Sequence, residues 1–228
     1  MLNTLLLLVK KDLRSCLHAG GAFTQSVLTG LLLVLLINMA GADLPAQNPR
    51  LLASGFWLAS LISIVLLAPA LYRNERPGLT ALLALGISPR LIWLEKTVSL
   101  MIMLAISQIV YLAAAYLFSE APILNYQWAV ITGIALCNAG LCVLGALLAS
   151  LTGTTAASQL AGLIFTPVCL PLVLAGINLA AIAYIQEATA YARPEVWRTL
   201  LFIAATDMVF IAAALIFSPV TFRENSNE

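Results

Sequence analysis

The residue types that most often perform chemistry in proteins are scarce in this chain. It has one histidine, His18, and its only lysines are Lys10, Lys11 and Lys96. No G-x-x-x-x-G-K-[ST] sequence occurs, so the chain cannot hold the phosphates of ATP in that type of loop. A single histidine cannot supply a metal-binding pair or both axial ligands of a heme. We therefore expect no enzyme, no metal site and no cofactor bound by this chain.

The cysteines do not indicate a site either. Cys137 and Cys142 are five residues apart, which puts them on different sides of a helix and makes them a poor metal pair. Cys16 and Cys169 also stand in apolar or cytoplasm-facing segments. We expect all of them to be buried free thiols and not a disulfide framework.

One carboxylate, Asp207, stands deep within an apolar stretch, LFIAATDMVFIAAAL. At about 1.5 Å per helical residue it lies ~13 Å beyond Arg198, inside a hydrocarbon layer. A charged side chain facing lipid there costs about 2.5 to 3.5 kcal/mol, so Asp207 should face protein or water. Either it lines a wet cavity, or it accepts a hydrogen bond from another helix, with Asn138 or Gln108 as the donor. We favour the hydrogen bond, because a single carboxylate without a basic partner makes a poor substrate site.

A short charged segment, residues 72–96, interrupts the apolar sequence, and we call it the island. Charged residues lie at both of its edges, and the leucine spacing between them predicts a surface helix over residues 78–87. Pro77 suits the first turn of this helix, and Gly86 suits its end. The helix either docks a partner protein, which we favour, or only connects two spans. The candidate docking residues are Arg73, Glu75, Arg76, Leu79, Leu82 and Leu83.

Composition assigns the rest of the chain to lipid. Hydrophobic residues make up 62% of it and charged residues 9%, against about 25% charged residues in an average soluble domain. The net charge of +1 gives no reason to expect nucleic acid as a partner. The short connections indicate one membrane domain, residues 1–228. Six stretches are long enough to span a bilayer, since about 20 residues cross it: residues 22–40, 51–72, 97–118, 128–151, 159–184 and 199–218.

Residues 1–19 predict an amphipathic helix at the membrane surface. If this helix is cytoplasmic, eight basic residues lie inside and three outside, in agreement with the positive-inside rule. Both termini and the island are then cytoplasmic, and residues 186–197 lie on the opposite side. The expected apolar stripe of this helix consists of Leu5, Leu8, Val9, Leu13, Cys16 and Leu17.

Within the predicted spans, three further patterns indicate how the helices pack. Pro167 and Pro171 predict a bend in the fifth span, which either borders a translocation path or is a static packing feature. The glycines of the fourth span, Gly133, Gly140 and Gly145, predict close helix packing. Most of the scattered tryptophans are expected to be anchors at the membrane surface.

Several short motifs resemble one family of membrane proteins. They are Leu71-Tyr-Arg-Asn at the end of the second span, Gly78-Leu79, Leu82, Leu85, Pro89 and Glu95-Lys96 in the island, and Thr166-Pro-Val-Cys-Leu-Pro-Leu in the fifth span. With the order of the elements, these motifs resemble the permease subunits of ABC-2 type exporters. More narrowly, they resemble the heme exporter protein B family, the membrane subunit of the cytochrome c maturation system. The likeness covers nearly the whole chain, and Pro77 departs from it where the island helix begins.

This resemblance implies an all-α permease of the bacterial inner membrane, with six transmembrane helices and the island as a coupling helix. It implies a separate ATPase subunit that binds ATP, a second permease copy, a heme-handling membrane subunit and a small single-span subunit, with heme as a cargo of the complex. Two alternatives share the layout. One is a generic ABC-2 exporter of a lipid-linked glycan or a drug, and the other is a membrane assembly factor without transport activity.

Overall fold

The computed structural model describes residues 2–18, 21–40, 49–73, 82, 85–118, 127–151, 155–185 and 194–224. Within these ranges the chain forms helices and no strand, so the predicted all-α class is confirmed. The helices are α1 (Leu2–His18), α2 (Ala22–Ala40), α3 (Pro49–Arg73), α5 (Pro89–Phe118), α6 (Gln127–Ser150), α7 (Thr155–Ile185) and α8 (Pro194–Glu224).

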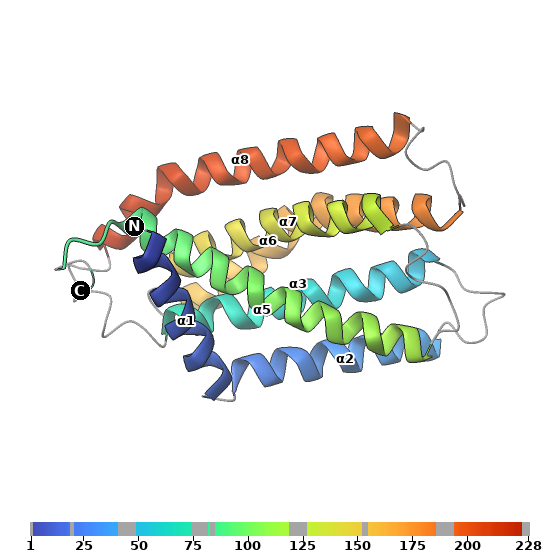
Figure 1. Ribbon diagram of the computed structural model, residues 1–228, viewed down its shortest axis with the longest axis horizontal. Coiled ribbons are helices and arrows are strands. Elements are labelled where there is room, and N and C mark those ends of the chain that lie inside the picture. The colour runs from blue at the N-terminus through green and yellow to red at the C-terminus, as the bar shows by residue number, and fades with distance from the viewer. Residues whose placement is uncertain are drawn as a thin grey trace.

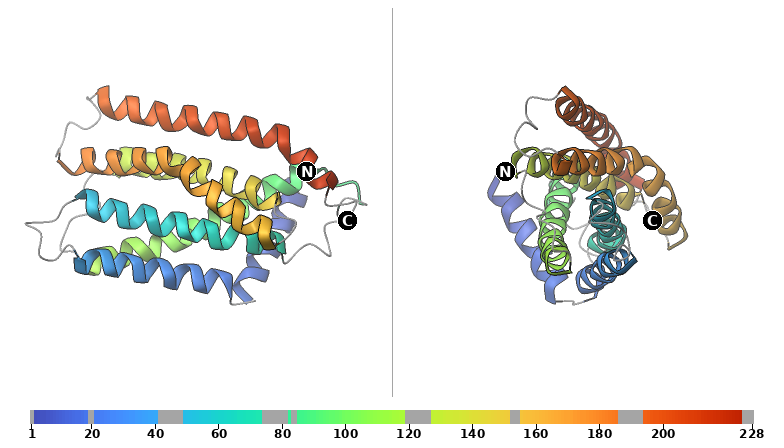
Figure 2. Two further views of the ribbon diagram at one scale, coloured as in Figure 1. Left: turned by 180° about the vertical axis from the view of Figure 1, so that it is seen from behind. Right: turned by 90° about the vertical axis from the view of Figure 1, so that its right-hand side faces the viewer.

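The long helices run side by side, and α1 crosses them at one end of the bundle (Figure 1). From α2 to α8 successive helices alternate in direction, so the end of α3, the start of α5 and the end of α8 all lie near α1 (Figure 1). We call this the α1 end and the opposite one the far end. α5 packs against α1, α2, α3, α6 and α8 and is the central helix, whereas α8 lies at the edge of the bundle (Figure 2).

The chain is a multi-pass membrane protein by the length and composition of its helices. Five of them are long and apolar enough to cross a membrane, with the stretches Arg50–Arg73, Pro89–Ala115, Trp128–Ser150, Leu163–Ile182 and Pro194–Ser218. The apolar stretch of α2, Ala22–Ile37, is shorter. Large apolar side chains such as Leu163 and Met208 cover the outer surface, as the hydrocarbon of a bilayer requires.

α5 begins at Pro89, eight residues before the predicted third span. The backbone nitrogen of Leu91 donates to Ser88 Oγ at 3.3 Å, and that of Ile92 donates to the Ser88 carbonyl at 3.2 Å. Ser88 therefore caps the helix, and Pro89 takes the first helical position, where its missing N–H removes no hydrogen bond. The island residues Glu95 and Lys96 thus belong to a helix of the core and not to a surface loop.

The predicted end of the island helix at Gly86 is confirmed. Leu82 is helical, Gly86 has a positive φ of 78°, and the backbone nitrogen of Ile87 donates to the Leu82 carbonyl at 3.2 Å. A bond of this span around a left-handed glycine is the usual C-terminal signature of a helix. The start of this helix lies outside the described residues.

The glycines of α6 allow close packing, as predicted, and each of them accommodates a different helix. A Cβ atom would overlap Leu179 of α7 at Gly133, Asp207 of α8 at Gly140 and Ile64 of α3 at Gly145. The small residues of α6 therefore set how near three neighbouring helices come.

α7 bends along its length (Figure 2), and Pro167 and Pro171 lie inside it. Both prolines are on the exposed face of the helix. The bend therefore shapes the outer surface of this chain, and the prolines do not line a path through its interior.

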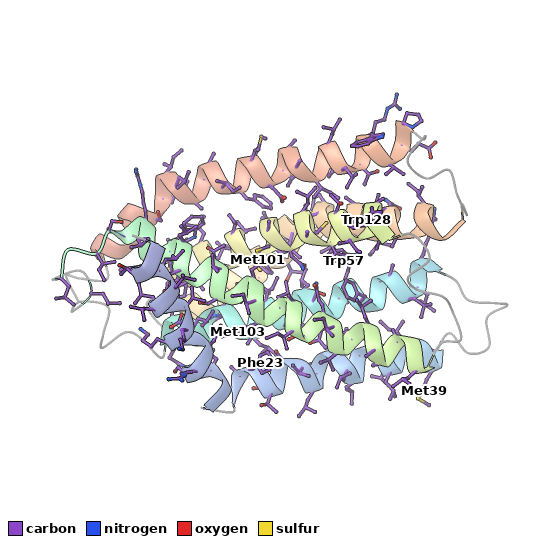
Figure 3. All side chains as sticks on the ribbon, in the orientation of Figure 1. Phe23, Met39, Trp57, Met101, Met103 and Trp128 are labelled. Carbon is purple, nitrogen blue, oxygen red and sulfur yellow. The ribbon has the colours of Figure 1, made fainter. Side chains whose placement is uncertain are left out.

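Only part of the tryptophan prediction holds. Trp128 is exposed near the start of α6 at the far end, as a membrane anchor would be (Figure 3). Trp197 is exposed near the start of α8, at the same end of the bundle. Trp57 and Trp93 are buried, which the prediction did not foresee. Trp57 packs against Gly176 of α7, where a Cβ atom would come within 2.5 Å of the indole ring.

Candidate functional site

The island joins α3 to α5 at the α1 end, and the structure describes part of it. Among the candidate docking residues, Arg73 is exposed at the end of α3, while Leu82 is half-buried and packs against the hydrophobic core. The Leu82 side chain therefore packs within this chain and is not a free anchor for a partner protein. Glu75, Arg76, Leu79 and Leu83 lie outside the described residues.

Leu85 is the most exposed large apolar side chain in the described part of the island, at 78% exposure. Ile87, two residues later, packs on the core, and Arg90 is exposed as the second residue of α5. Leu85 and Arg90 were not among the predicted docking residues. The signal that could have found Leu85 is its position directly before the capping glycine, where the chain turns away from the helix.

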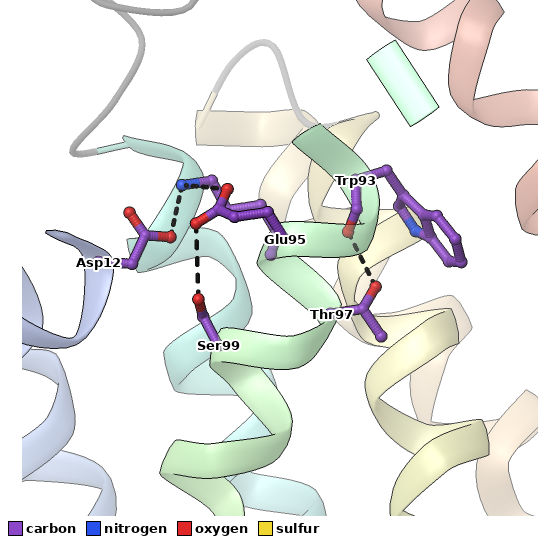
Figure 4. Close-up of polar contacts among 6 residues, drawn as sticks. Asp12, Trp93, Glu95, Thr97 and Ser99 are labelled. Carbon is purple, nitrogen blue, oxygen red and sulfur yellow. Dashed lines mark hydrogen bonds and ion pairs between the residues drawn. The ribbon is translucent and has the colours of Figure 1, made fainter. Parts of the chain in front are cut away.

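A buried cluster of charged groups includes the last two residues of the island (Figure 4). Lys96 of α5 is 1% exposed, and its Nζ lies 2.6 Å from Oδ2 of Asp12, which is 2% exposed on α1. Glu95 Oε2 lies 3.4 Å from the same Nζ, and Ser99 Oγ donates to Glu95 Oε1 at 3.5 Å. Tyr72 at the end of α3 is close enough to interact electrostatically with the carboxyl groups of Glu95 and Asp12. The cluster thus ties α1 to the first turns of α5.

The buried face of α1 explains why this ion pair forms. Val9 and Cys16 are buried and Leu13 is half-buried, so the predicted apolar stripe is confirmed at these positions. Asp12 falls inside the stripe, three residues after Val9 and four before Cys16, and must therefore be buried with it. The sequence analysis left it out. The available signal was a carboxylate on the apolar face of an amphipathic helix, which requires a cation opposite it.

Cys16 lies one turn beyond Asp12 on the same face. Burial and the nearby Asp12 charge raise the pKa of its thiol, while Lys96 lowers it to a smaller extent. The thiol is therefore protonated and unreactive at neutral pH. All four cysteines are free and buried, as predicted.

A second polar group lies deeper in the bundle, where α3, α5 and α6 meet. Gln108 Nε2 donates to Asn138 Oδ1 at 2.8 Å, and Asn138 Nδ2 donates back to Gln108 Oε1 at 2.6 Å. Gln108 Nε2 also donates to Ser60 Oγ at 3.0 Å. These two amides therefore satisfy each other and are not donors to Asp207, contrary to the prediction.

Tyr111, one turn further along α5, connects this helix to α2 and makes a second contact with α3. Its hydroxyl donates to the Ser26 carbonyl of α2 at 3.0 Å and lies 2.7 Å from Ser63 Oγ of α3. The ring packs so closely on α2 that a Cβ atom at Gly30 would overlap it. Polar contacts thus hold α5 to helices on several sides.

Asp207 faces protein, as predicted, and is 5% exposed at the middle of α8. Neither of its carboxyl oxygens has a hydrogen-bond partner in the part of the chain that the structure describes. The predicted bond from Asn138 or Gln108 is therefore absent. Its Oδ1 lies against Gly140 of α6, with Leu172 of α7 beside it.

These arrangements contain no catalytic constellation, and no group of three His, Cys, Asp or Glu residues in the described ranges could hold a metal ion. The polar groups connect helices instead. Comparison of the chain with known protein families, with curated proteins and with solved structures finds no match.

Proposed function

We propose that this chain is the membrane permease subunit of an ABC-type exporter, of the heme exporter protein B kind. It spans the bacterial inner membrane six times, with α2 as the first span and both termini in the cytoplasm. A separate ATPase subunit docks on the island and hydrolyses ATP. A second permease copy, a heme-handling subunit and a small single-span subunit complete the complex, which carries heme as its cargo.

The observation that carries this proposal is how the island is attached. Leu82 and Ile87 pack its described part against the core, and Ser88, the next residue after Ile87, caps the start of α5. Two turns later Lys96 bonds to Asp12 of α1. A push on the island is therefore transmitted directly to the central helix and to the surface helix. A transporter driven by an external ATPase needs a rigid attachment of this kind.

The distribution of charge supports the proposed orientation. Lys10, Lys11, Arg73 and Arg90 belong to the α1 end, whereas Arg50 and Arg198 start helices at the far end. An excess of basic residues at the α1 end is typical of the cytoplasmic side. The alternating directions of α2 to α8 bring the end of α8 back to the same side.

Replacement of one exposed leucine tests the docking. In Leu85→Asp we expect the permease to insert normally, because this side chain packs little against its own chain. We expect the co-purified ATPase to fall by about tenfold or more, since loss of an apolar anchor costs about 2 kcal/mol of binding free energy. The measurement is affinity purification of the tagged chain from its native membranes, with the bound subunits identified by mass spectrometry.

The matched control is Leu151→Asp. Leu151 is also an exposed leucine, at the end of α6 on the same side of the bundle, but outside the island. It should leave the ATPase bound. Full ATPase binding by Leu85→Asp would show that the island does not dock it. Glycan or drug-resistance proteins among the bound subunits would favour the generic exporter, and purification without any ATPase would favour the assembly factor.

A further inference from the structure

The middle of α8 holds a buried carboxyl group that the proposed function does not use. Both oxygens of Asp207 are inaccessible, and neither has a hydrogen-bond partner within the described ranges. The carboxyl group fills the space that the missing side chain of Gly140 leaves on α6, and Leu172 of α7 borders the same space. Residues of α6, α7 and α8 therefore pack closely together at this one acidic side chain.

The groups around this carboxyl offer it no counter-charge. The nearby group on α6 is the buried thiol of Cys137, which is close enough to interact electrostatically with Asp207. This thiol donates to the Leu172 carbonyl at 3.7 Å. α7 presents the apolar Leu172. The charged residues of α5 all lie between Pro89 and Lys96 near the α1 end, whereas Asp207 is midway along α8. An ionised carboxylate here would face apolar groups and one thiol, which is highly unfavourable.

A cation that binds here must therefore need a single ligand. Metal ions are poor candidates, because they need several ligands and no group of three His, Cys, Asp or Glu residues in the described part of the chain could hold one. A proton needs one carboxyl oxygen only. We propose that Asp207 is a proton-binding site, and that the neutral acid is the state in which α8 packs on α6.

Ionisation of Asp207 and packing of α8 on α6 then exclude each other. The carboxylate needs water, and water reaches it only when α8 separates from Gly140. The contact between these two helices is therefore linked to proton binding. This inference does not depend on the docking of an ATPase and can fail or hold independently of it.

Direct observation of the carboxyl groups tests the proposal. The chain has only three aspartates, Asp12, Asp43 and Asp207. We would incorporate aspartate with a ¹³C-labelled carboxyl carbon, reconstitute the full chain in lipid bilayers, and record solid-state NMR spectra near neutral pH. We expect one neutral carboxyl signal, which Asp207→Asn removes. Asp12 is the internal reference, because it is equally buried but has Lys96 as a charged partner.

Two results would overturn the proposal: three ionised aspartates in the unaltered chain, or a neutral signal that persists in Asp207→Asn. If Asp207→Asn fails to accumulate, Asp207→Leu is used to assign the neutral signal to Asp207. Whether any aspartate is neutral is decided by the spectrum of the unaltered chain alone.

Labelling of Cys137 by N-ethylmaleimide tests the linkage to packing, in a chain whose other cysteines are replaced. Between neutral and alkaline buffer we expect labelling to rise severalfold more with Asp207 than with Asn, because only Asp gains a charge that separates the helices. Equal rises would refute this linkage.

Discussion

The central helix α5 and the outer helix α8 each bury an acidic side chain, and they do so in opposite ways. Glu95 of α5 lies in a cluster with Lys96, Asp12 and Ser99. Asp207 of α8 has no hydrogen-bond partner in the described part of the chain, and a glycine, a leucine and a thiol lie near it. In its most apolar stretch α8 is also the less buried of the two, at 28% against 50% for α5.

This difference separates two ways in which helices are held in a membrane. Directional polar contacts join α5 to α1, α2, α3 and α6. Such contacts allow one relative position, because any displacement leaves buried polar groups unpaired. Around Asp207, α8 packs on α6 through the shape of Gly140, and shape complementarity is less sensitive to small displacements. We infer that α5 is the fixed part of the bundle and that α8 is the helix better able to move.

The largest effect should come from Lys96→Met, which breaks the polar attachment of α5. It leaves Asp12 and Glu95 buried without their cation, and loss of one partner of a buried ion pair costs about 3 to 5 kcal/mol. We expect a correspondingly lower free energy of unfolding, measured by denaturant titration of the purified chain in detergent micelles.

The double variant Asp12→Asn with Lys96→Met should recover much of that stability, because it removes an unpaired charge. If Lys96→Met is as stable as the unaltered chain, the ion cluster does not fix α1 on α5. The contrast drawn between α5 and α8 would then be refuted.

A smaller effect is expected from Gln108→Leu. The substitution leaves the amide group of Asn138 without its partner, and an unpaired buried polar group costs about 1 to 3 kcal/mol. Gln108→Leu combined with Asn138→Leu removes both amides and should lie closer to the unaltered chain. The same unfolding measurement checks both variants, and equal losses in the single and double variants would show that the pair does not act as a unit.

The smallest effect should come from Gly140→Ala, which acts on the contact with α8. The added methyl group would overlap Asp207 and crowd Leu172, and overpacking of this kind costs about 1 to 3 kcal/mol. Gly133→Ala is the matched control: the close neighbour there is the tip of the Leu179 side chain, which can rotate away. We expect thermal unfolding to start at a lower temperature in Gly140→Ala. A larger loss in Gly133→Ala would show that the fit at Asp207 is not the tighter of the two.

Hydropathy and local sequence signals were sufficient to predict that the chain is a bundle of membrane-spanning helices. The low charge content and the length of the apolar stretches determine a multi-pass helical protein, because only helices satisfy the backbone in lipid without closing a barrel. Gly86 determined the end of the island helix through its tolerance of positive φ. Ser88 and Pro89 are also a sequence signal for the start of α5. The prediction used hydropathy alone and therefore placed the start of this span at the first uncharged residue after Lys96.

Only the tertiary structure decided which polar groups meet. Asp12 and Lys96 are 84 residues apart, and Gln108 and Asn138 are 30 apart, so their pairing depends on the rotation of whole helices about their axes. The same rotations bury Trp57 and Trp93 and place Asp207 against Gly140. Apolar sequence in a membrane does not encode these rotations strongly, because lipid and protein interior are nearly equally apolar. The choice between them comes from packing and from the few buried hydrogen bonds.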